Sequence, residues 1–331
     1  MYIEFYKFTR LPFQLTPDAR FFFASSGHAK AMAHLTYGLG QGEGFIIITG
    51  DIGAGKTTVV ENLLRELDSR KYVAAKITNT QLGADDMLRM VGSAFGIDQE
   101  GTDKATLLRR FEAFLQRVDH QGQRGLLLVD ECQNLSIPAL EELRMLSNLQ
   151  IDGRAPLQSF LLGQPQFRVT LARPELDQLR QRVIASYHLG PLNETETRRY
   201  IEHRLCTVGW NNDPRLSDGV FAAIHHHCGG VPRKINALCS RVLLFGYLED
   251  RHALNEVDVD EVARDLALES SRVLPPTPGE NGPSVSPVPE TTEHDRLSER
   301  IAALETQLAA QDRTIRKLLK MAAAFLDSES P

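Results

Sequence analysis

The sequence predicts an α/β protein in which a parallel β-sheet is sandwiched by helices and followed by a small all-helical domain. Apolar runs of strand length recur through the first 190 residues and alternate with segments of helical periodicity. Several of these runs are apolar at every residue, which is typical of parallel strands buried on both faces. After Pro191 the strand-like runs stop and only helical periodicity continues.

Five apolar runs are the expected strands, and they cover residues 44–50, 72–79, 125–131, 159–164 and 185–192. The segment TTVVENLLRELDS follows the first run, and its apolar residues form one helical stripe: Val59, Val60, Leu63, Leu64 and Leu67. Ser136 is a candidate N-cap for a later helix, with Pro138 in the first turn, where its missing N–H costs little. The alternation of strands and helices predicts right-handed βαβ units and a sheet covered on both faces.

The sequence divides into four regions, of which the α/β domain occupies residues 1–192. Four helical segments follow and predict a helical lid domain over residues 193–270. Residues 271–293 are rich in Pro, Gly and Ser and carry few large apolar side chains, which predicts a disordered, flexible linker. Residues 294–327 repeat apolar positions at a 4-3-4-3 spacing, interrupted once by Gln311, which predicts a coiled-coil helix. A single helix docked on the body is the alternative, against which the linker argues.

Composition restricts the classes of partner. The 331-residue chain has a formal net charge of −6 and a pI near 6.0. It therefore has no global positive field to hold nucleic acid or anionic lipid, and nucleic acid is not an expected partner. Its four cysteines are too scattered for a disulfide framework. No apolar run approaches the roughly 18 residues of a spanning helix, and the first residues lack a signal-peptide pattern. We expect no transmembrane segment and a cytoplasmic protein.

Residues 50–58 read GDIGAGKTT and directly follow the apolar run FIIIT. The stretch matches the G-x-x-x-x-G-K-[ST] pattern, whose glycines let main-chain N–H groups wrap phosphate oxygens. Lys56 supplies a charge for the β- and γ-phosphates, and the Thr57 hydroxyl is a candidate Mg²⁺ ligand. A strand before and a helix after are the context that the pattern requires. The predicted nucleotide-binding residues are Gly50, Asp51, Ile52, Gly53, Ala54, Gly55, Lys56, Thr57 and Thr58.

Asp130 and Glu131 end the run LLLVDE, at the carboxyl end of a buried strand. Two adjacent carboxylates in such a place are costly unless a cation or a substrate pairs with them. Asp130 is placed to hold Mg²⁺, directly or through water, and Glu131 is the candidate base that polarises an attacking water. A pair of helix-capping residues is the alternative interpretation.

These motifs and several longer stretches resemble those of AAA+ P-loop ATPases in the general secretion pathway protein A (ExeA-like) group. The resemblance covers residues 1 to about 270 and includes KITNTQL, LLLVDECQNLS, FLLGQPQF, QLRQRVIASYHLGPL, YIEHRL and GGVPRKINALC. Within that group it is closest to the secretion ATPases of exosortase/PEP-CTERM exopolysaccharide loci. The resemblance implies an AAA+ nucleotide-binding domain followed by a helical lid.

The resemblance also implies roles for Asn79 and Gln164, each of which ends an expected strand. Asn79 resembles the polar switch residue that holds the catalytic glutamate, here Glu131, inactive. Gln164 ends the run FLLGQ and occupies the sensor-1 position, where a polar side chain contacts the γ-phosphate or the water. All three residues end expected strands.

Three arginines resemble residues that act on the phosphates. Arg182 or Arg180 corresponds to the arginine finger that completes the site of a neighbouring subunit, with Arg182 preferred. Arg233 corresponds to sensor 2, carried by the lid. A surface ion pair is the alternative for each arginine. The segment from Leu15 to Asp18, with His28, is a weaker candidate for the adenine pocket, since apolar packing explains it equally well.

The implied activity is ATP hydrolysis by a ring-type homo-oligomer, with ATP and Mg²⁺ bound and the lid moving against the sheet domain. The resemblance alone implies the output, which is to energise or assemble an envelope machine for secretion or exopolysaccharide export. Two alternatives remain open: a DNA-transaction regulatory ATPase resembling the transposition helper ATPases, and a nucleotide-gated scaffold with little turnover.

The sequence departs from the ExeA-like pattern after residue 270. ExeA-like proteins continue with a membrane span and a periplasmic peptidoglycan-binding segment, whereas here a linker and a heptad helix follow. We therefore expect attachment to a membrane-associated export complex through residues 294–327 instead of direct contact with the cell wall. Peripheral attachment at the inner membrane is the alternative to a freely cytoplasmic location.

Overall fold

The structure is a computed structural model that describes residues 2–16, 18–78, 80, 83–99 and 103–273. Three sequence predictions fall outside these residues. They are the switch residue Asn79, the linker beyond residue 273, and the coiled-coil helix 294–327.

A five-stranded sheet forms the centre of the α/β part, in the order β2-β3-β4-β1-β5. Every neighbouring pair of strands is parallel, as predicted. The five expected strands are all present, with ends shifted by at most three residues: β1 (Phe45–Gly50), β2 (Tyr72–Ile77), β3 (Arg124–Val129), β4 (Leu157–Gly163) and β5 (Val183–Leu189). Because all strands run the same way, the ends of β1, β3 and β4 meet at one edge of the sheet.

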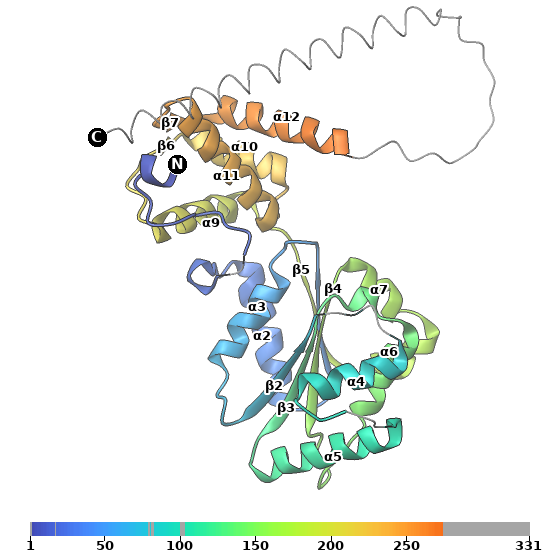
Figure 1. The fold of residues 1–331 in the computed structure, drawn as a ribbon. Helices are drawn as coiled ribbons and strands as arrows, with labels where there is room; N and C mark the ends of the chain where they lie inside the picture. The colour runs from blue at the N-terminus through green and yellow to red at the C-terminus, as the bar shows by residue number, and fades with distance from the viewer. Residues whose placement is uncertain (1, 17, 79, 81–82, 100–102, 274–331) are drawn as a thin grey trace, which may run out of the picture. The chain divides into compact units, whose positions relative to one another are not determined.

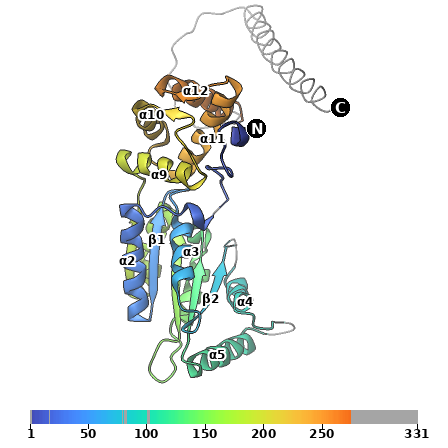
Figure 2. The same ribbon diagram turned by 90° about the vertical axis from the view of Figure 1, so that its left-hand side faces the viewer.

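Helices cover both faces of this sheet, which confirms the predicted sandwich (Figure 1, Figure 2). Side chains of β1 alternate between the two faces: Phe45 and Ile47 join one core, while Ile46 and Ile48 join the other. The core of Ile46 contains side chains of α2 (Ser26–Gln41) and α3 (Lys56–Glu66). The opposite core contains side chains of α4 (Ala84–Ala94), α5 (Lys104–His120), α6 (Ile137–Leu146) and α7 (Pro165–Leu171).

The start of α6 follows the predicted capping chemistry. The Ser136 side chain accepts a hydrogen bond from the Ala139 N–H at 3.3 Å, and Pro138 stands in the first turn. A short 3₁₀ turn, Cys132–Asn134, leads from β3 toward this helix. Another, Pro174–Leu176, and the short helix α8 (Asp177–Arg180) lead from α7 to β5.

The second part of the chain is helical, with two differences from the prediction. Its helices are α9 (Glu194–Thr207), α10 (Asp218–Cys228), α11 (Pro232–Leu248) and α12 (Glu256–Val273). Two short strands that the sequence did not indicate, β6 (Arg215–Leu216) and β7 (Ala253–Leu254), pair in parallel. Strands of two residues are too short to produce a periodic signal. Helix α12 also passes residue 270, the predicted end of the lid domain. Among the helices described, none is long and apolar enough to cross a membrane.

The first residues of the chain pack with the helical domain, although the sequence placed them in the α/β domain. Helix α1 (Tyr2–Phe5) begins a segment whose apolar side chains join the core of α9, α10, α11 and α12. The Tyr6 hydroxyl donates to the Arg251 carbonyl at 3.0 Å, and the Thr9 N–H donates to the Val208 carbonyl at 2.9 Å. The segment is thereby fixed to the lid before it reaches the sheet.

The start of α2 is joined to the start of α9. The Ser25 side chain caps α2 by accepting from the His28 N–H, and its hydroxyl lies 2.6 Å from His28 Nδ1. The Ser26 N–H donates to Glu196 Oε1 at 2.8 Å, while Glu196 also completes a capping box with Asn193 at the start of α9. One carboxylate therefore connects a helix of the sheet domain with a helix of the lid.

We expect His28→Gln to reduce the pH dependence of stability. Burial lowers the pKa of His28 from its ordinary value of 6.5, and the nearby Glu196 carboxylate opposes the shift. Because the lowered pKa makes His28 bind a proton less readily in the folded protein than in the unfolded chain, protonation favours unfolding as the pH falls from about 7 to about 5. The melting temperature of the variant, followed by circular dichroism, should fall less over this interval than that of the unmodified protein.

The matched control is His120→Gln, at the exposed end of α5, whose melting temperature should fall as much as that of the unmodified protein. An equal fall in the melting temperature of the His28 variant would show that burial does not lower the pKa of His28.

Candidate functional site

The loop of residues 50–58 joins β1 to α3 and requires glycine at several positions. Gly53 and Gly55 adopt φ values of 80° and 98°, in the left-handed region that favours glycine. A Cβ on Gly50 would lie 2.5 Å from the Leu189 carbonyl oxygen, and one on Gly55 would lie 2.7 Å from His28 Nε2. The sequence thus permits a tight main-chain loop directly before the first turn of α3, where free N–H groups favour an anion.

The Lys56 ammonium is buried inside this loop. Nζ donates to the main-chain oxygens of Gly50 at 2.8 Å and Asp51 at 3.0 Å. Burial lowers the pKa of Lys56, and the nearby carboxylates of Glu131, Asp130 and Asp51 oppose that shift. The arrangement concentrates positive charge at the carboxyl end of β1.

Thr57 and Asp130 meet beside the loop. Thr57 Oγ1 donates to Asp130 Oδ2 at 2.8 Å, and the Glu131 N–H donates to Asp130 Oδ1 at 2.9 Å. Hydroxyl and carboxylate oxygens suit Mg²⁺, which usually takes one or two protein groups and completes its shell with water and phosphate. Within the described part of the chain, no group of three or more His, Cys, Asp or Glu residues offers an all-protein metal cage. The Thr57–Asp130 pair therefore fits Mg²⁺ that arrives with a phosphate ligand.

The Glu131 carboxylate is held by two glutamine side chains. Its Oε2 accepts from Gln164 Nε2 at 3.1 Å and from Gln133 Nε2. Its main chain is left-handed, with φ of 54°, and its carbonyl accepts from the Thr80 hydroxyl at 3.0 Å. Residues other than glycine adopt this conformation at a cost, and it recurs at functional sites. The structure thus brings the predicted base and the predicted sensor-1 residue together.

Gln133 is a site residue that the sequence analysis missed. Besides its bond to Glu131, its Oε1 accepts from the Gln164 N–H at 2.9 Å, so it also holds the main chain after β4. The only sequence signal was its place two residues after Glu131. The contact requires the 3₁₀ turn of residues 132–134 and the neighbouring strand β4, and neither can be inferred from residue spacing.

A cavity of about 380 Å³ lies over the loop. Its walls come from the phosphate loop, from residues near the start of the chain, and from helices α9 and α11 of the lid. Four of the adenine-pocket candidates, Leu15, Thr16, Asp18 and His28, line it, while Pro17 is outside the described residues. The lining residues include Gln14, Leu15, Asp18, Phe21, His28, Gly53, Lys56, Thr57, Glu131, Tyr200, Arg204, Arg233 and Asn236.

Arg233 places the lid directly on the phosphate loop. It stands in the first turn of α11, and its N–H donates to the Gly53 carbonyl at 3.3 Å. A Cβ on Gly53 would lie 2.3 Å from the Arg233 Cβ, so the absence of a side chain there permits the approach. The predicted sensor-2 residue therefore lies in the wall of the cavity.

Arg180 and Arg182 lie away from this cavity. Arg182 precedes β5 and its carbonyl accepts from the Phe45 N–H, at the opposite end of the parallel strands from Gly50. Its Nη1 donates to the Ser147 carbonyl at 3.2 Å, and Arg180 Nη1 donates to the Leu171 carbonyl at 3.1 Å. Both are exposed. Neither arginine lines the cavity of its own chain, and a role at a neighbouring site remains a prediction.

Comparisons with known proteins agree with this site. Residues 39–171 match the sequence model of a family described as AAA domain. The chain is 34% identical over 273 residues to general secretion pathway protein A of Aeromonas hydrophila, in an alignment that covers 81% of this chain and 49% of the relative. This chain thus spans about half of the length of that relative.

Solved structures share the fold at low sequence identity. The ORC2 protein of Aeropyrum pernix, solved in ADPNP–ADP complexes, has a TM-score of 0.59 and 16% identity, covering 77% of this chain and 71% of that chain. Cdc6p of Pyrobaculum aerophilum has a TM-score of 0.57 and 13% identity, covering 78% of this chain and 75% of that chain. These likenesses concern the fold alone.

The family model covers residues 39–171, which carry the phosphate loop and the two acids, and the curated relative aligns over most of the chain. The predicted fold class and the predicted family are therefore confirmed. The chain belongs to the AAA+ ATPases, in the group of general secretion pathway protein A.

Proposed function

We propose that this chain hydrolyses ATP with Mg²⁺ in a homo-oligomer and that hydrolysis energises or assembles an envelope system for secretion or exopolysaccharide export. The observation that carries the enzymatic part is the Glu131 carboxylate, held by two amides beside the Thr57–Asp130 pair and the Lys56 loop. A carboxylate fixed next to a phosphate-binding loop is suited to take a proton from an attacking water.

Each residue of the site has a part in this reaction. The main-chain N–H groups of the loop and the Lys56 ammonium bind the triphosphate. Thr57 and Asp130 would hold Mg²⁺, which neutralises charge on the phosphate oxygens when bound. Glu131 orients the water and accepts its proton. Gln133 and Gln164 hold the Glu131 carboxylate in place, so that less reorganisation is needed when water attacks.

The export role is supported by the similarity to general secretion pathway protein A. The resemblance to ATPases of exosortase/PEP-CTERM loci adds exopolysaccharide export as the alternative cargo class.

We further propose that residues 294–327 provide a coiled-coil attachment to a membrane-associated complex, with the ATPase body in the cytoplasm. Deleting these residues should release the protein from a membrane fraction without lowering its basal ATPase rate.

Glu131→Gln should abolish turnover while preserving nucleotide binding. The amide keeps the shape of the side chain but cannot accept the proton, so single-turnover hydrolysis should slow by about 10²- to 10⁴-fold. The dissociation constant for ATP should change little, because binding depends on the loop. Glu112→Gln, exposed on α5, is the matched control and should hydrolyse at the normal rate.

Equal hydrolysis rates in the Glu131 variant and the unmodified protein would favour a nucleotide-gated scaffold.

The same substitution at the native locus should stop the export of protein or polysaccharide, measured in the culture medium. Normal export would contradict the envelope role. Salt-sensitive retention of DNA only in the ATP state would favour the DNA-transaction alternative.

Gln133→Ala should lower kcat for ATP by about tenfold, since it removes one of the two amides that hold Glu131. KM for ATP should remain within about threefold of that of the unmodified protein, because Gln133 is not among the residues that line the cavity. Gln116→Ala, exposed on α5, serves as the control. A rise in KM with unchanged kcat would show that Gln133 acts on binding instead of on the base.

Arg182→Ala should lose ATP turnover, and mixing this variant with the inactive variant Glu131→Gln should restore it. Subunits with Glu131→Gln keep both arginines, whereas subunits with Arg182→Ala keep the base. If the arginine acts at the site of a neighbour, mixing the two proteins creates interfaces that contain both groups, and the ATPase rate rises above that of either alone. The same mixture with Arg180→Ala identifies which arginine acts. No recovery in either mixture would contradict an arginine finger in trans.

A further inference from the structure

One part of the cavity wall is built by residues close to the start of the chain. Gln14, Asp18 and Phe21 line the cavity together with Tyr200 and Arg204 of α9. Between Pro12 and Phe21, the described residues contain one short 3₁₀ turn, Ala19–Phe21, and no longer element. The shape of this wall therefore depends on side chains that hold main-chain groups.

Arg204 is the side chain that ties this wall to the lid. Its Nε donates to the Pro12 carbonyl at 2.7 Å, Nη2 donates to the Gln14 carbonyl at 3.4 Å, and Nη1 donates to Tyr200 Oη at 2.7 Å. Arg204 is only 5% exposed. One planar guanidinium thus joins two main-chain carbonyls of the N-terminal segment to a lid side chain, a geometry that a lysine ammonium cannot reproduce.

The buried charge of Arg204 is balanced without a carboxylate. In the part of the chain that the structure describes, no ion pair joins Arg204 to an acidic side chain. The guanidinium carbon instead lies 4.6 Å from the centroid of the Phe21 ring and 5.6 Å from that of Tyr200. Carbonyl oxygens and aromatic faces stabilise such a cation. The position of the guanidinium and the position of the wall therefore determine each other.

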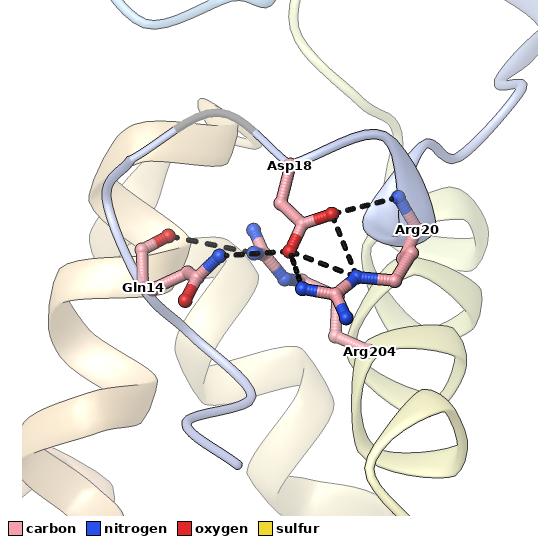
Figure 3. Close-up of polar contacts among 4 residues, drawn as sticks. All are labelled: Gln14, Asp18, Arg20 and Arg204. Atoms are coloured by element: carbon pink, nitrogen blue, oxygen red, sulfur yellow. Dashed lines mark hydrogen bonds and ion pairs between the residues drawn. The ribbon is translucent and has the colours of Figure 1, made fainter.

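Asp18 joins residues of the same wall to one another (Figure 3). Its Oδ1 accepts from the Arg20 N–H at 3.0 Å, its Oδ2 pairs with Arg20 Nη2 at 2.6 Å, and the Gln14 amide donates to Oδ2 at 3.2 Å. Gln14 thereby belongs to both groups of contacts, because its carbonyl accepts from Arg204. The Asp18 contacts shape the wall, and Arg204 attaches it to α9.

We infer that Arg204 is a positioning residue that holds the N-terminal wall of the nucleotide cavity on the lid, so that wall and lid act as one body. The bonds from Tyr6 to Arg251 and from Thr9 to Val208 join the same segment to the lid. Most predicted phosphate-binding groups belong instead to the loop after β1, which Arg233 of the lid also approaches. The inference rests on the proposed function only in taking ATP as the occupant of the cavity.

Because Arg204 holds the wall on the lid and the phosphate loop belongs to the sheet domain, loss of Arg204 should affect the binding of ATP and of a phosphate-only ligand differently. Lys56 and the loop contact phosphates, and they belong to the sheet domain. The contacts of Arg204 are to the N-terminal segment and to α9, so its loss should weaken contacts to the nucleoside part of ATP and spare contacts to phosphate. Inorganic tripolyphosphate carries the phosphates alone and is the matching probe.

The test measures binding of ATP and of tripolyphosphate by calorimetry in the full chain with Arg204→Met and Arg204→Lys. Arg204→Met should lower ATP affinity by at least about tenfold and change tripolyphosphate affinity by less than about twofold. Arg204→Lys should lie between Arg204→Met and the unmodified protein, because it keeps the charge and loses the planar fork. Tyr200→Phe, which removes one acceptor and keeps the ring, should show the same selectivity with a smaller loss, and it replaces Arg204→Met if that variant does not fold.

Two controls define the outcome. Arg199→Met, exposed on the same helix, should leave both affinities unchanged, and Lys56→Ala should weaken both. Normal ATP affinity in folded Arg204→Met, or an equal loss for both ligands, would overturn the inference. An unmodified protein that binds neither ligand would contradict the proposed function instead.

Discussion

The site depends on a lysine ammonium buried at the carboxyl end of a parallel strand. Burying a cation is unfavourable unless other groups compensate it. For Lys56 the compensation comes from two main-chain oxygens at 2.8 and 3.0 Å and from nearby carboxylates. Glycine makes this possible, because the loop turns through left-handed conformations at Gly53 and Gly55. The same loop begins α3, whose unpaired N–H groups add positive potential. A triphosphate is the ligand that this combination of charge and geometry favours.

The remaining groups of the site come from two bodies that meet at the loop. The sheet supplies the phosphate loop, the acids after β3 and the glutamine after β4. The lid supplies the first turn of α11, which approaches Gly53 through the Arg233 N–H, and the α9 side chains that hold the N-terminal wall. Glu196 adds a further link by bonding to the starts of both α2 and α9. Movement of the lid would therefore change the cavity walls that α9, α11 and the N-terminal segment supply, whereas Lys56, Thr57 and Asp130 belong to the sheet domain.

The sequence predicted the parts of the molecule that depend on local pattern. Fully apolar runs identified the five strands of the large sheet, the glycine-lysine pattern identified the loop, and the end of LLLVDE identified Asp130 and Glu131. The sequence did not reveal Gln133 or Arg204, because their contacts depend on how separate parts of the chain fold together: Gln133 also bonds to Gln164, and Arg204 bonds to the N-terminal segment. Arg204 contacts residues about 190 positions away, and in the sequence it reads as one more arginine on a polar helix. The packing of the first residues on the lid was missed for the same reason.

The position of β5 has a consequence for how the protein can be divided. The family match ends at residue 171, whereas β5, which begins at Val183, pairs with β1 along its whole length. A fragment cut at the family boundary would turn β1 into an edge strand and expose a row of unpaired amides and carbonyls beside the phosphate loop, a surface prone to aggregation. It would also lose residues 26–38 of α2, which are most of that helix, and the lid contact to Gly53. The smallest autonomous folding unit is therefore larger than the region by which the family is recognised.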